Sequence, residues 1–207
     1  MIKLKNIETI IFDLGGVVID LDSKSVIDQF RRYSNKTTKD IIRLISHSQD
    51  LIDYEVGKMS DSDFCEAVNK LLHTELSQAS FEIIWNSFLG NIKQDKLHLM
   101  LALKDRFNLL ILSNTNAIHQ KSFDQRVGEL IPSRVMSDMV NTAYYSHELG
   151  LRKPDPNIYK RVIDLQNLNP TRTLFFDDRH ENINMAQDFG IQAIQVEHSD
   201  HILDLLR

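Results

Sequence analysis

The sequence predicts an α/β fold, in which a doubly wound parallel sheet has an all-helical cap inserted after its first strand. Four short apolar runs alternate with helical patterns, and each run ends at a polar residue. Runs that are apolar on both faces are typical of a parallel sheet covered by helices. A long stretch after the first run instead shows helical spacing throughout. These observations together predict one core with one insert.

The strands are expected where β-branched and aromatic residues cluster between polar ends. A fifth run is weaker, because it combines two tyrosines with threonine and alanine. The expected strands are Thr9–Phe12, Leu109–Leu112, Thr142–Tyr145 (the weaker one), Thr173–Phe176 and Gln192–Val196.

Helical patterns alternate with the strands. Asp95–Phe107 places its large apolar residues near one face, as a helix packed on a sheet does. Pro156 follows an N-capping Asp155 and opens a helix that runs to about Leu165. The helix Glu181–Phe189 ends before a glycine, as is common at helix C-termini.

The stretch 22–90 contains apolar residues at helical spacing and no convincing strand. We therefore expect residues 1–21 and 91–207 to form the α/β core and residues 22–90 to form the helical cap. Apolar positions that indicate these helices include Ile27, Phe30, Ile41, Phe64, Val68, Phe81 and Trp85.

Composition and charge exclude several classes of protein. The 207 residues include 24 basic and 29 acidic ones, which give a net charge of −5 and argue against a basic nucleic-acid-binding face. A single cysteine excludes an internal disulfide and fits a reducing compartment. The N-terminus has no long apolar stretch. We expect a cytoplasmic monomer or homodimer that binds neither nucleic acid nor membrane.

Polar residues that could perform chemistry follow the predicted strands. Because ligands bind beyond the carboxyl ends of parallel strands, these residues should meet at one edge of the sheet. Each alone has an ordinary explanation as a turn residue, helix cap or surface charge. Together they point to a site, since adjacent carboxylates repel each other unless a cation or hydrogen bonds compensate. They are Asp13, Ser113, Asn114, Lys153, Asp177 and Asp178.

This set of residues suits phosphoryl transfer. An aspartate with an ordinary pKa of about 3.9 is ionised at neutral pH and can act as a nucleophile. Mg²⁺, held by carboxylates, and the Lys153 ammonium would offset the charge repulsion between Asp13 and a phosphate. The Ser113 hydroxyl and backbone N–H groups near Gly16 and Asn114 could hold the phosphoryl oxygens. The sequence thus predicts Mg²⁺ as cofactor.

Four motifs in order carry a family resemblance. Asp13-Leu14-Gly15-Gly16-Val17, Ser113-Asn114, Lys153-Pro154-Asp155 and Asp177-Asp178 closely resemble those of the haloacid dehalogenase-like hydrolases. The segment from Leu174 to Ile183 and the approach Gly150-Leu151-Arg152 look like those of helical-cap phosphatases in that family, which have a Rossmann-like core. The resemblance implies a small phosphorylated metabolite of the sugar-phosphate type as substrate.

The resemblance implies a role for each motif residue. Asp13 would form an aspartyl-phosphate and bind Mg²⁺, and the carbonyl of Gly15 would be a further metal ligand. Asp178 would bind the metal directly, and Asp177 either directly or through water. Lys153 would neutralise the phosphoryl group that Ser113 holds. Asn114 and Asn182 are plausible supporting residues.

Gly15 departs from the pattern that the resemblance suggests. The commoner family pattern has a second aspartate here, which protonates the leaving group, and general acid–base catalysis is typically worth about 10²–10⁴-fold. Its absence disfavours a mutase and favours leaving groups that tolerate negative charge, such as anomeric phosphates. The alternative is a non-catalytic protein that binds phosphate and metal, or a regulatory one.

Substrate selection is expected in the cap, which would lie over the strand ends. Four of its residues are polar or amphipathic enough to reach a ligand, although each alone is more often a core or surface residue. They are Asp53, Tyr54, Trp85 and Asn86.

Overall fold

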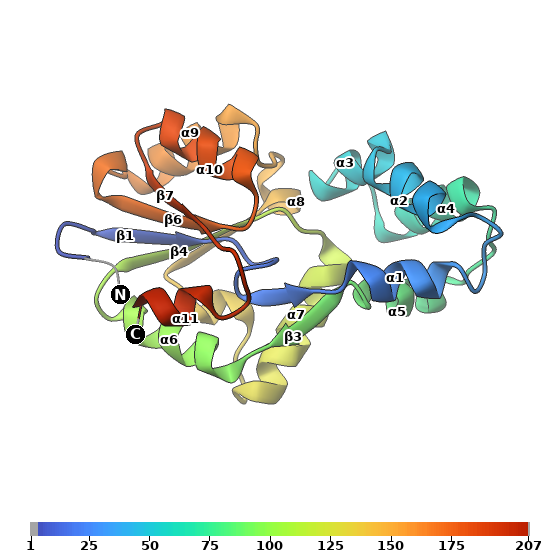
Figure 1. Ribbon diagram of the computed structural model, residues 1–207, viewed down its shortest axis with the longest axis horizontal. Helices are drawn as coiled ribbons and strands as arrows, with labels where there is room; N and C mark the ends of the chain where they lie inside the picture. Colours follow the sequence, from blue (N-terminus) through green and yellow to red (C-terminus); the bar gives the residue numbers. More distant parts are fainter. Residues whose placement is uncertain (1–3, 207) are drawn as a thin grey trace.

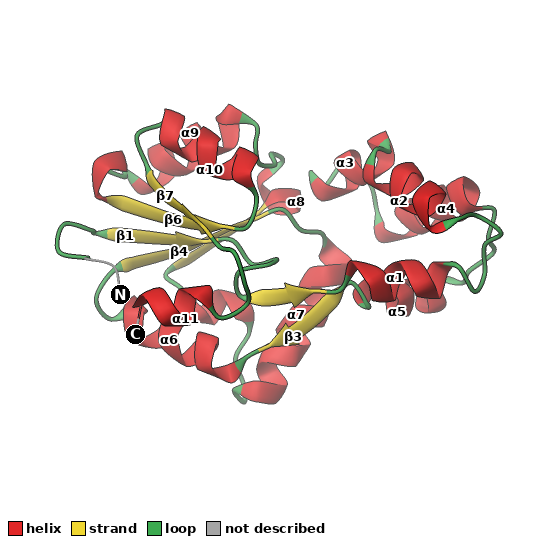
Figure 2. Cartoon of the chain, in the orientation of Figure 1, coloured by secondary structure: helices red, strands yellow, loops and turns green. Residues whose placement is uncertain are grey.

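The computed structural model describes residues 4–206, and its central element is a five-stranded sheet (Figures 1 and 2). Every pair of neighbouring strands is parallel, in the order β5-β4-β1-β6-β7. The predicted parallel sheet is confirmed, including its weaker strand. The strands are β1 (Thr9–Phe12), β4 (Asn108–Ser113), β5 (Thr142–Tyr145), β6 (Thr173–Asp177) and β7 (Gln192–Gln195).

Helices cover both faces of this sheet, so the doubly wound arrangement is also confirmed. Side chains alternate along β1: Ile10 and Phe12 belong to one apolar core and Ile11 to another. The first core includes residues of α6 (Gln94–Lys104), α7 (Ala117–Leu130) and α11 (His201–Leu206). The second includes residues of α9 (Pro156–Gln166) and α10 (His180–Asp188).

A second, two-stranded sheet was not predicted. β2 (Ile19–Leu21) pairs antiparallel with β3 (Leu89–Ile92), so the stretch 22–90 is not helical to its end. The two strands are short and far apart in sequence, and neither leaves a periodic pattern. Gly90 permits their close approach, since a Cβ there would lie 2.9 Å from the Asp20 carbonyl oxygen.

Between β2 and β3 the chain forms five helices, which we call the helical insert. Serine or threonine caps the first turn of each helix from α2 to α5. The insert has an apolar core of its own, in which the rings of Tyr54 and Phe64 stack 4.1 Å apart. Its helices are α1 (Ser23–Phe30), α2 (Thr38–Ser46), α3 (Gln49–Glu55), α4 (Asp61–Leu72) and α5 (Gln78–Asn86).

The insert lies beyond the carboxyl ends of the parallel strands, at the right of Figure 1. α5 packs against α7, and α3 packs against the short helix α8 (Ser146–Leu149). At the second contact Gly57, with φ +72°, faces the His147 carbonyl oxygen, and a Cβ there would lie only 2.1 Å from that oxygen. Docking of the insert at α8 therefore depends on a glycine.

The helices are short. Among residues 4–206 the longest is α7, with 14 residues. A helix of this length spans about 21 Å, against roughly 30 Å of bilayer hydrocarbon. Accordingly, none of the described helices has both the length and the apolar character to cross a membrane.

Candidate active site

The predicted site residues meet at one edge of the sheet. Asp13 directly follows β1, while Ser113 and Asp177 are the last residues of β4 and β6. Lys153 reaches the same edge from the loop after α8. A cavity of about 160 Å³ opens there between the core and the insert. Predicted site residues that line it are Asp13, Gly15, Ser113, Asn114, Lys153, Asp178 and Asn182.

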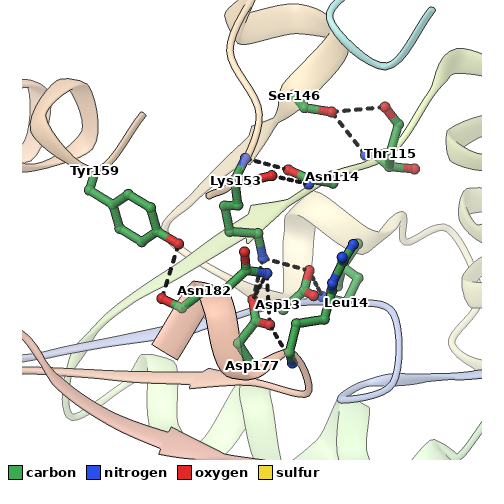
Figure 3. A network of polar contacts seen from close by, with 10 residues as sticks. Asp13, Leu14, Asn114, Thr115, Ser146, Lys153, Tyr159, Asp177 and Asn182 are labelled. Carbon is green, nitrogen blue, oxygen red and sulfur yellow. Dashed lines mark hydrogen bonds and ion pairs between the residues drawn. The ribbon is translucent and has the colours of Figure 1, made fainter. Parts of the chain in front are cut away.

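Lys153 links two of the carboxylates (Figure 3). Its Nζ lies 2.6 Å from Asp177 Oδ2 and 3.1 Å from Asp13 Oδ1, and its side chain is 1% exposed. Burial lowers the pKa of this ammonium, but Asp13 and Asp177 outweigh burial, so the net shift of the pKa is upward. The lysine is therefore a fixed positive charge beside Asp13.

Asp13 has an unusual environment for a carboxylate. Burial raises its pKa to about 7, and although Lys153 opposes this shift, Asp177 and Asp178 add to it. One lysine does not balance three carboxylates. The cluster thus has a deficit of positive charge, which a bound cation would supply.

Asp177 is fully engaged in holding Lys153. Besides the lysine, Asn182 Nδ2 donates to both of its oxygens at 2.9 and 3.0 Å, and the backbone N–H of Arg179 donates to Oδ1 at 2.9 Å. Since each oxygen already accepts from two donors, Asp177 serves here to orient the lysine. Its predicted contact with a metal, direct or through water, stays a prediction.

The backbone of Lys153 is fixed as well. Asn114 donates from Nδ2 to the Lys153 carbonyl and accepts from its N–H at Oδ1, each at 2.8 Å. Ser146 Oγ bonds both the N–H and the carbonyl of Thr115, which ties this loop to α8 (Figure 3). The Asn114 side chain thus positions the lysine, and the predicted role of its N–H toward substrate stays a prediction.

Oxygens of Asp13, Asp177 and Asp178 lie within 4.8 Å of one another and could hold a metal ion. Because the Asp177 oxygens are engaged, Asp13 and Asp178 have the ligand capacity that remains. A hard cation that keeps several waters, such as Mg²⁺, fits a site with few protein ligands. Gly15 lines the same cavity, so its carbonyl stays the predicted backbone ligand.

Gly16 makes room for Asp178 rather than lining the cavity. Its φ is +73°, and a Cβ there would lie 2.6 Å from Asp178 Oδ2. The role of Gly16 in phosphate binding stays a prediction. The structure shows a second reason for a glycine at this position, since only a residue without a side chain lets the Asp178 carboxylate approach the loop after β1.

The space beside Gly15 is filled by another side chain. A Cβ at Gly15 would lie 3.3 Å from Leu21 Cδ1, and Leu21 lines the cavity. An apolar leucine therefore lies next to the position where the resembling family commonly has its acid.

The insert contributes different residues from those expected. Asp53, Tyr54 and Asn86 do not line the cavity beside Asp13, and neither does Trp85. Tyr54 and Trp85 belong to the core of the insert, and Asp53 instead accepts a hydrogen bond from Gln49 at 3.0 Å.

The residues that do line it, and that sequence reasoning missed, include Glu55, Phe88 and Arg152. Glu55 is the neighbour of Tyr54 and the last residue of α3. Of these three residues, only Arg152 could have been predicted to line the site, because it is adjacent to Lys153 in the sequence.

A doubly wound sheet with an aspartate, a lysine and an acidic pair at its carboxyl edge defines a class of phosphoryl-transfer folds. A sequence model of the haloacid dehalogenase-like hydrolases matches residues 7–190. The chain belongs to this family and is a hydrolase.

Individual relatives agree over nearly the whole chain. It is 28% identical over 193 residues to a D-ribitol-5-phosphate phosphatase of Bacteroides thetaiotaomicron, and the match covers 92% of this chain and 92% of the relative. It is 23% identical to a phosphorylated carbohydrates phosphatase of Thermotoga maritima, with 90% of this chain and 83% of the relative covered.

Solved structures agree with the fold. A family enzyme from Bacteroides thetaiotaomicron, in complex with magnesium and inorganic phosphate, superposes with a TM-score of 0.83 at 29% identity and covers 91% of this chain and 93% of that one. L-2-haloacid dehalogenase from Xanthobacter autotrophicus has a TM-score of 0.62 at 18% identity over 91% of this chain and 77% of that one, which shows a shared fold.

Proposed function

We propose that this chain is a Mg²⁺-dependent phosphatase that hydrolyses a small phosphorylated metabolite of the sugar-phosphate type through an aspartyl-phosphate on Asp13. The observation that carries the proposal is the placement of Asp13 beside Lys153, 3.1 Å away, in the cavity that Ser113 also lines. Two relatives named as phosphatases of ribitol phosphate and phosphorylated carbohydrates support the substrate class. A related structure with magnesium and phosphate supports the cofactor.

In the first step a carboxylate oxygen of Asp13 attacks phosphorus, and the P–O bond to the ester oxygen breaks. The electron pair leaves with that oxygen, which takes a proton from water. Lys153 neutralises charge on the transferring group, and the Ser113 hydroxyl donates to a phosphoryl oxygen. Asp13, Asp178 and the Gly15 carbonyl would hold Mg²⁺, which when bound offsets the charge on the phosphoryl oxygens.

In the second step water attacks phosphorus of the aspartyl-phosphate. The bond between phosphorus and the Asp13 oxygen breaks, and the carboxylate is restored. Inorganic phosphate keeps one proton of the attacking water, and the other proton neutralises the hydroxide left by the first step. Lys153 keeps the returning negative charge paired. The two steps together convert a phosphate monoester and water into an alcohol and phosphate.

The leaving group is expected to be one that tolerates negative charge. Gly15 has no side chain, and Leu21 occupies the adjoining space, so no carboxylic acid is present there to protonate the ester oxygen. Anomeric phosphates, acyl phosphates and aryl phosphates should therefore react faster than simple alkyl phosphates. Rates over phosphate esters of graded leaving-group pKa test this expectation, and a flat dependence would contradict it.

The decisive experiment measures phosphate release from p-nitrophenyl phosphate and from a panel of sugar phosphates, with and without Mg²⁺. We expect Mg²⁺-dependent hydrolysis, and a kcat lower by about 10³-fold or more in Asp13→Asn, because the amide is not a nucleophile. Asp53→Asn, the same substitution outside the cavity, should keep the wild-type rate. Retention of more than about a tenth of the activity in Asp13→Asn would refute the proposal.

A further inference from the structure

Glu55 is the one carboxylate that the helical insert contributes to the cavity among the residues described. It ends α3, and its Oε2 lies 3.0 Å from Nη2 of Arg152. Arg152 immediately precedes Lys153 and lines the same cavity. The side chains of Glu55 and Arg152 are 16% and 26% exposed. An ion pair thus joins the insert to the loop that presents the lysine.

This pair leaves two buried polar atoms without a hydrogen bond. Oε2 of Glu55 and Nε of Arg152 are both inaccessible to solvent and have no hydrogen-bond partner, so the close contact between the two charges is not aligned as a hydrogen bond. An unsatisfied buried polar atom is costly and rare, so the two charges do not fully satisfy each other in this arrangement.

Several other polar groups around the cavity are already engaged. Both ring nitrogens of His119 have partners at 3.2 Å, namely Asn116 Nδ2 and the Trp85 carbonyl. Arg179 pairs with Glu181. Asn182 also has an unpartnered Oδ1, but its amide nitrogen is bound to Asp177 at the acidic end of the site.

A hydroxyl group matches the parts of this pair that line the cavity, where both side chains are partly exposed. It donates one hydrogen bond, which the carboxylate of Glu55 can accept, and it accepts one, which the guanidinium of Arg152 can donate. A second negative group would be repelled by Glu55, and an apolar group would cover both charges without offering either a hydrogen bond. Leu21 and Phe88 line the same cavity and offer an apolar surface to C–H groups. Hydroxyls on a carbon chain or ring combine both requirements.

We propose that Glu55 and Arg152 form a leaving-group subsite that binds the hydroxyl groups of a polyol or sugar, while Leu21 and Phe88 contact its C–H face. This inference rests on the proposed phosphatase function and names residues that select the substrate. Glu55 is then a specificity residue. It binds the part of the substrate that departs and leaves the attack of Asp13 on phosphorus to the core.

The test compares a hydroxyl-bearing substrate with one whose leaving group has none. We would measure kcat/KM for D-ribitol 5-phosphate and glucose 1-phosphate, take the better of the two, and divide its kcat/KM by that for phenyl phosphate. Hydrogen bonds to charged groups are worth about 1.5–3 kcal/mol, so Glu55→Ala should lower this ratio by about 10- to 100-fold, mainly through KM.

Matched variants separate recognition from folding. Glu55→Gln keeps an acceptor oxygen and should recover part of the ratio, and Arg152→Gln should lower it as Glu55→Ala does. Asp53→Asn, on the same helix but outside the cavity, should leave the ratio unchanged. Thermal unfolding of each variant identifies those that have lost structure.

Two results would overturn the subsite. An equal fall of kcat/KM for both substrates in Glu55→Ala would place Glu55 in the phosphoryl-transfer step or in the fold. An unchanged ratio would show that no hydroxyl contacts it. Wild-type hydrolysis of phenyl phosphate reports the proposed function separately, and its absence together with that of both other substrates would refute the function and the subsite that rests on it.

Discussion

The two sides of the cavity differ in how completely their polar groups are paired. On the core side Lys153, Asp177, Asn182 and Asn114 are joined by hydrogen bonds of 2.6 to 3.0 Å, and Asn182 Oδ1 is their one side-chain atom that is buried without a partner. On the side facing the insert, atoms of Glu55 and Arg152 are buried without hydrogen-bond partners. The two sides are only a residue apart in the chain, because Arg152 precedes Lys153.

This difference separates chemistry from recognition. A phosphoryl group has the same shape and charge in every monoester, so the groups that act on it can be fixed before the substrate binds. The leaving group is what distinguishes one substrate from another. In the proposed subsite the side chains of Glu55 and Arg152 gain further hydrogen bonds only from a leaving group that carries hydroxyls. Variants that disturb one side only should therefore change either turnover or selectivity.

The largest effect is expected from Lys153→Met. Loss of the cation leaves Asp13 and Asp177 buried without their shared counter-charge, which typically costs about 3–5 kcal/mol. We expect kcat to fall by about 10³-fold or more and the melting temperature to fall, with partial recovery of the melting temperature in Mg²⁺. Phosphate release and calorimetry with and without Mg²⁺ measure both effects.

Lys160→Met is the control for this variant. Lys160 is exposed on α9, and within residues 4–206 its one ion pair is with Asp164 four residues on, so its loss should change neither quantity appreciably. If Lys153→Met were as stable as the control and kept its activity, the core side of the cavity would not depend on the buried ion pairs.

A smaller but still large effect is expected from Gly16→Ala. The new Cβ would lie 2.6 Å from Asp178 Oδ2, so the carboxylate must move away from the loop after β1. We expect the Mg²⁺ concentration for half-maximal activity to rise by about tenfold or more. Gly190→Ala is the control: its φ of +78° gives a similar backbone strain, but its Cβ meets only Pro170 at 3.7 Å. Equal Mg²⁺ requirements in the two variants would argue against a metal role for Asp178.

The sequence predicts the core side of the cavity better than the side that faces the insert. Asp13, Ser113 and Asp177 were predictable because each ends an apolar run, and parallel topology brings strand ends together. The pair β2–β3 was not, because it is formed by three- and four-residue strands that meet only across the insert.

The residues that the insert contributes to the cavity were the hardest to predict from the sequence. Tyr54 and Trp85 drew attention as amphipathic residues, yet both pack in the insert core. Glu55 is adjacent to Tyr54, and no periodicity tells which of two neighbours at a helix end turns toward the core domain. That choice is made by the docking of α3 on α8, a tertiary contact.

Gly57→Ala should move the insert side without touching its polar groups. A Cβ only 2.1 Å from the His147 carbonyl oxygen forces α3 away from α8, and Glu55 lies two residues before this glycine. We expect the ratio of kcat/KM between a hydroxylated substrate and phenyl phosphate to fall by several-fold, while kcat for phenyl phosphate changes less. A fall in kcat alone would show that docking of the insert serves turnover and would weaken the separation of the two sides.

The smallest effect concerns pH and His119, which holds the insert to the core. Burial lowers the pKa of His119 to about 4. Its Nδ1 faces the amide nitrogen of Asn116 and its Nε2 faces the Trp85 carbonyl, so the neutral ring with the proton on Nε2 satisfies both contacts. Asn116 cannot readily turn its amide, since Oδ1 caps α7 by accepting from the His119 N–H at 3.0 Å. A protonated ring would therefore oppose one donor with another.

The sign of the pH effect follows from these contacts. Between pH 6.5 and about 4 the unfolded chain binds a proton at His119 that the folded chain does not, so the free energy of unfolding must fall as the pH is lowered through this window. The largest possible fall in the free energy of unfolding is about 3 kcal/mol, since each pKa unit is worth roughly 1.4 kcal/mol.

His119→Asn should show a shallower decline of melting temperature over the window, and His73→Asn, at an exposed position, should keep the wild-type decline. His147, whose pKa burial also lowers, is present in every variant and cancels in the difference. Equal slopes for His119→Asn and the wild type would mean that the contact between α5 and α7 tolerates a charged ring.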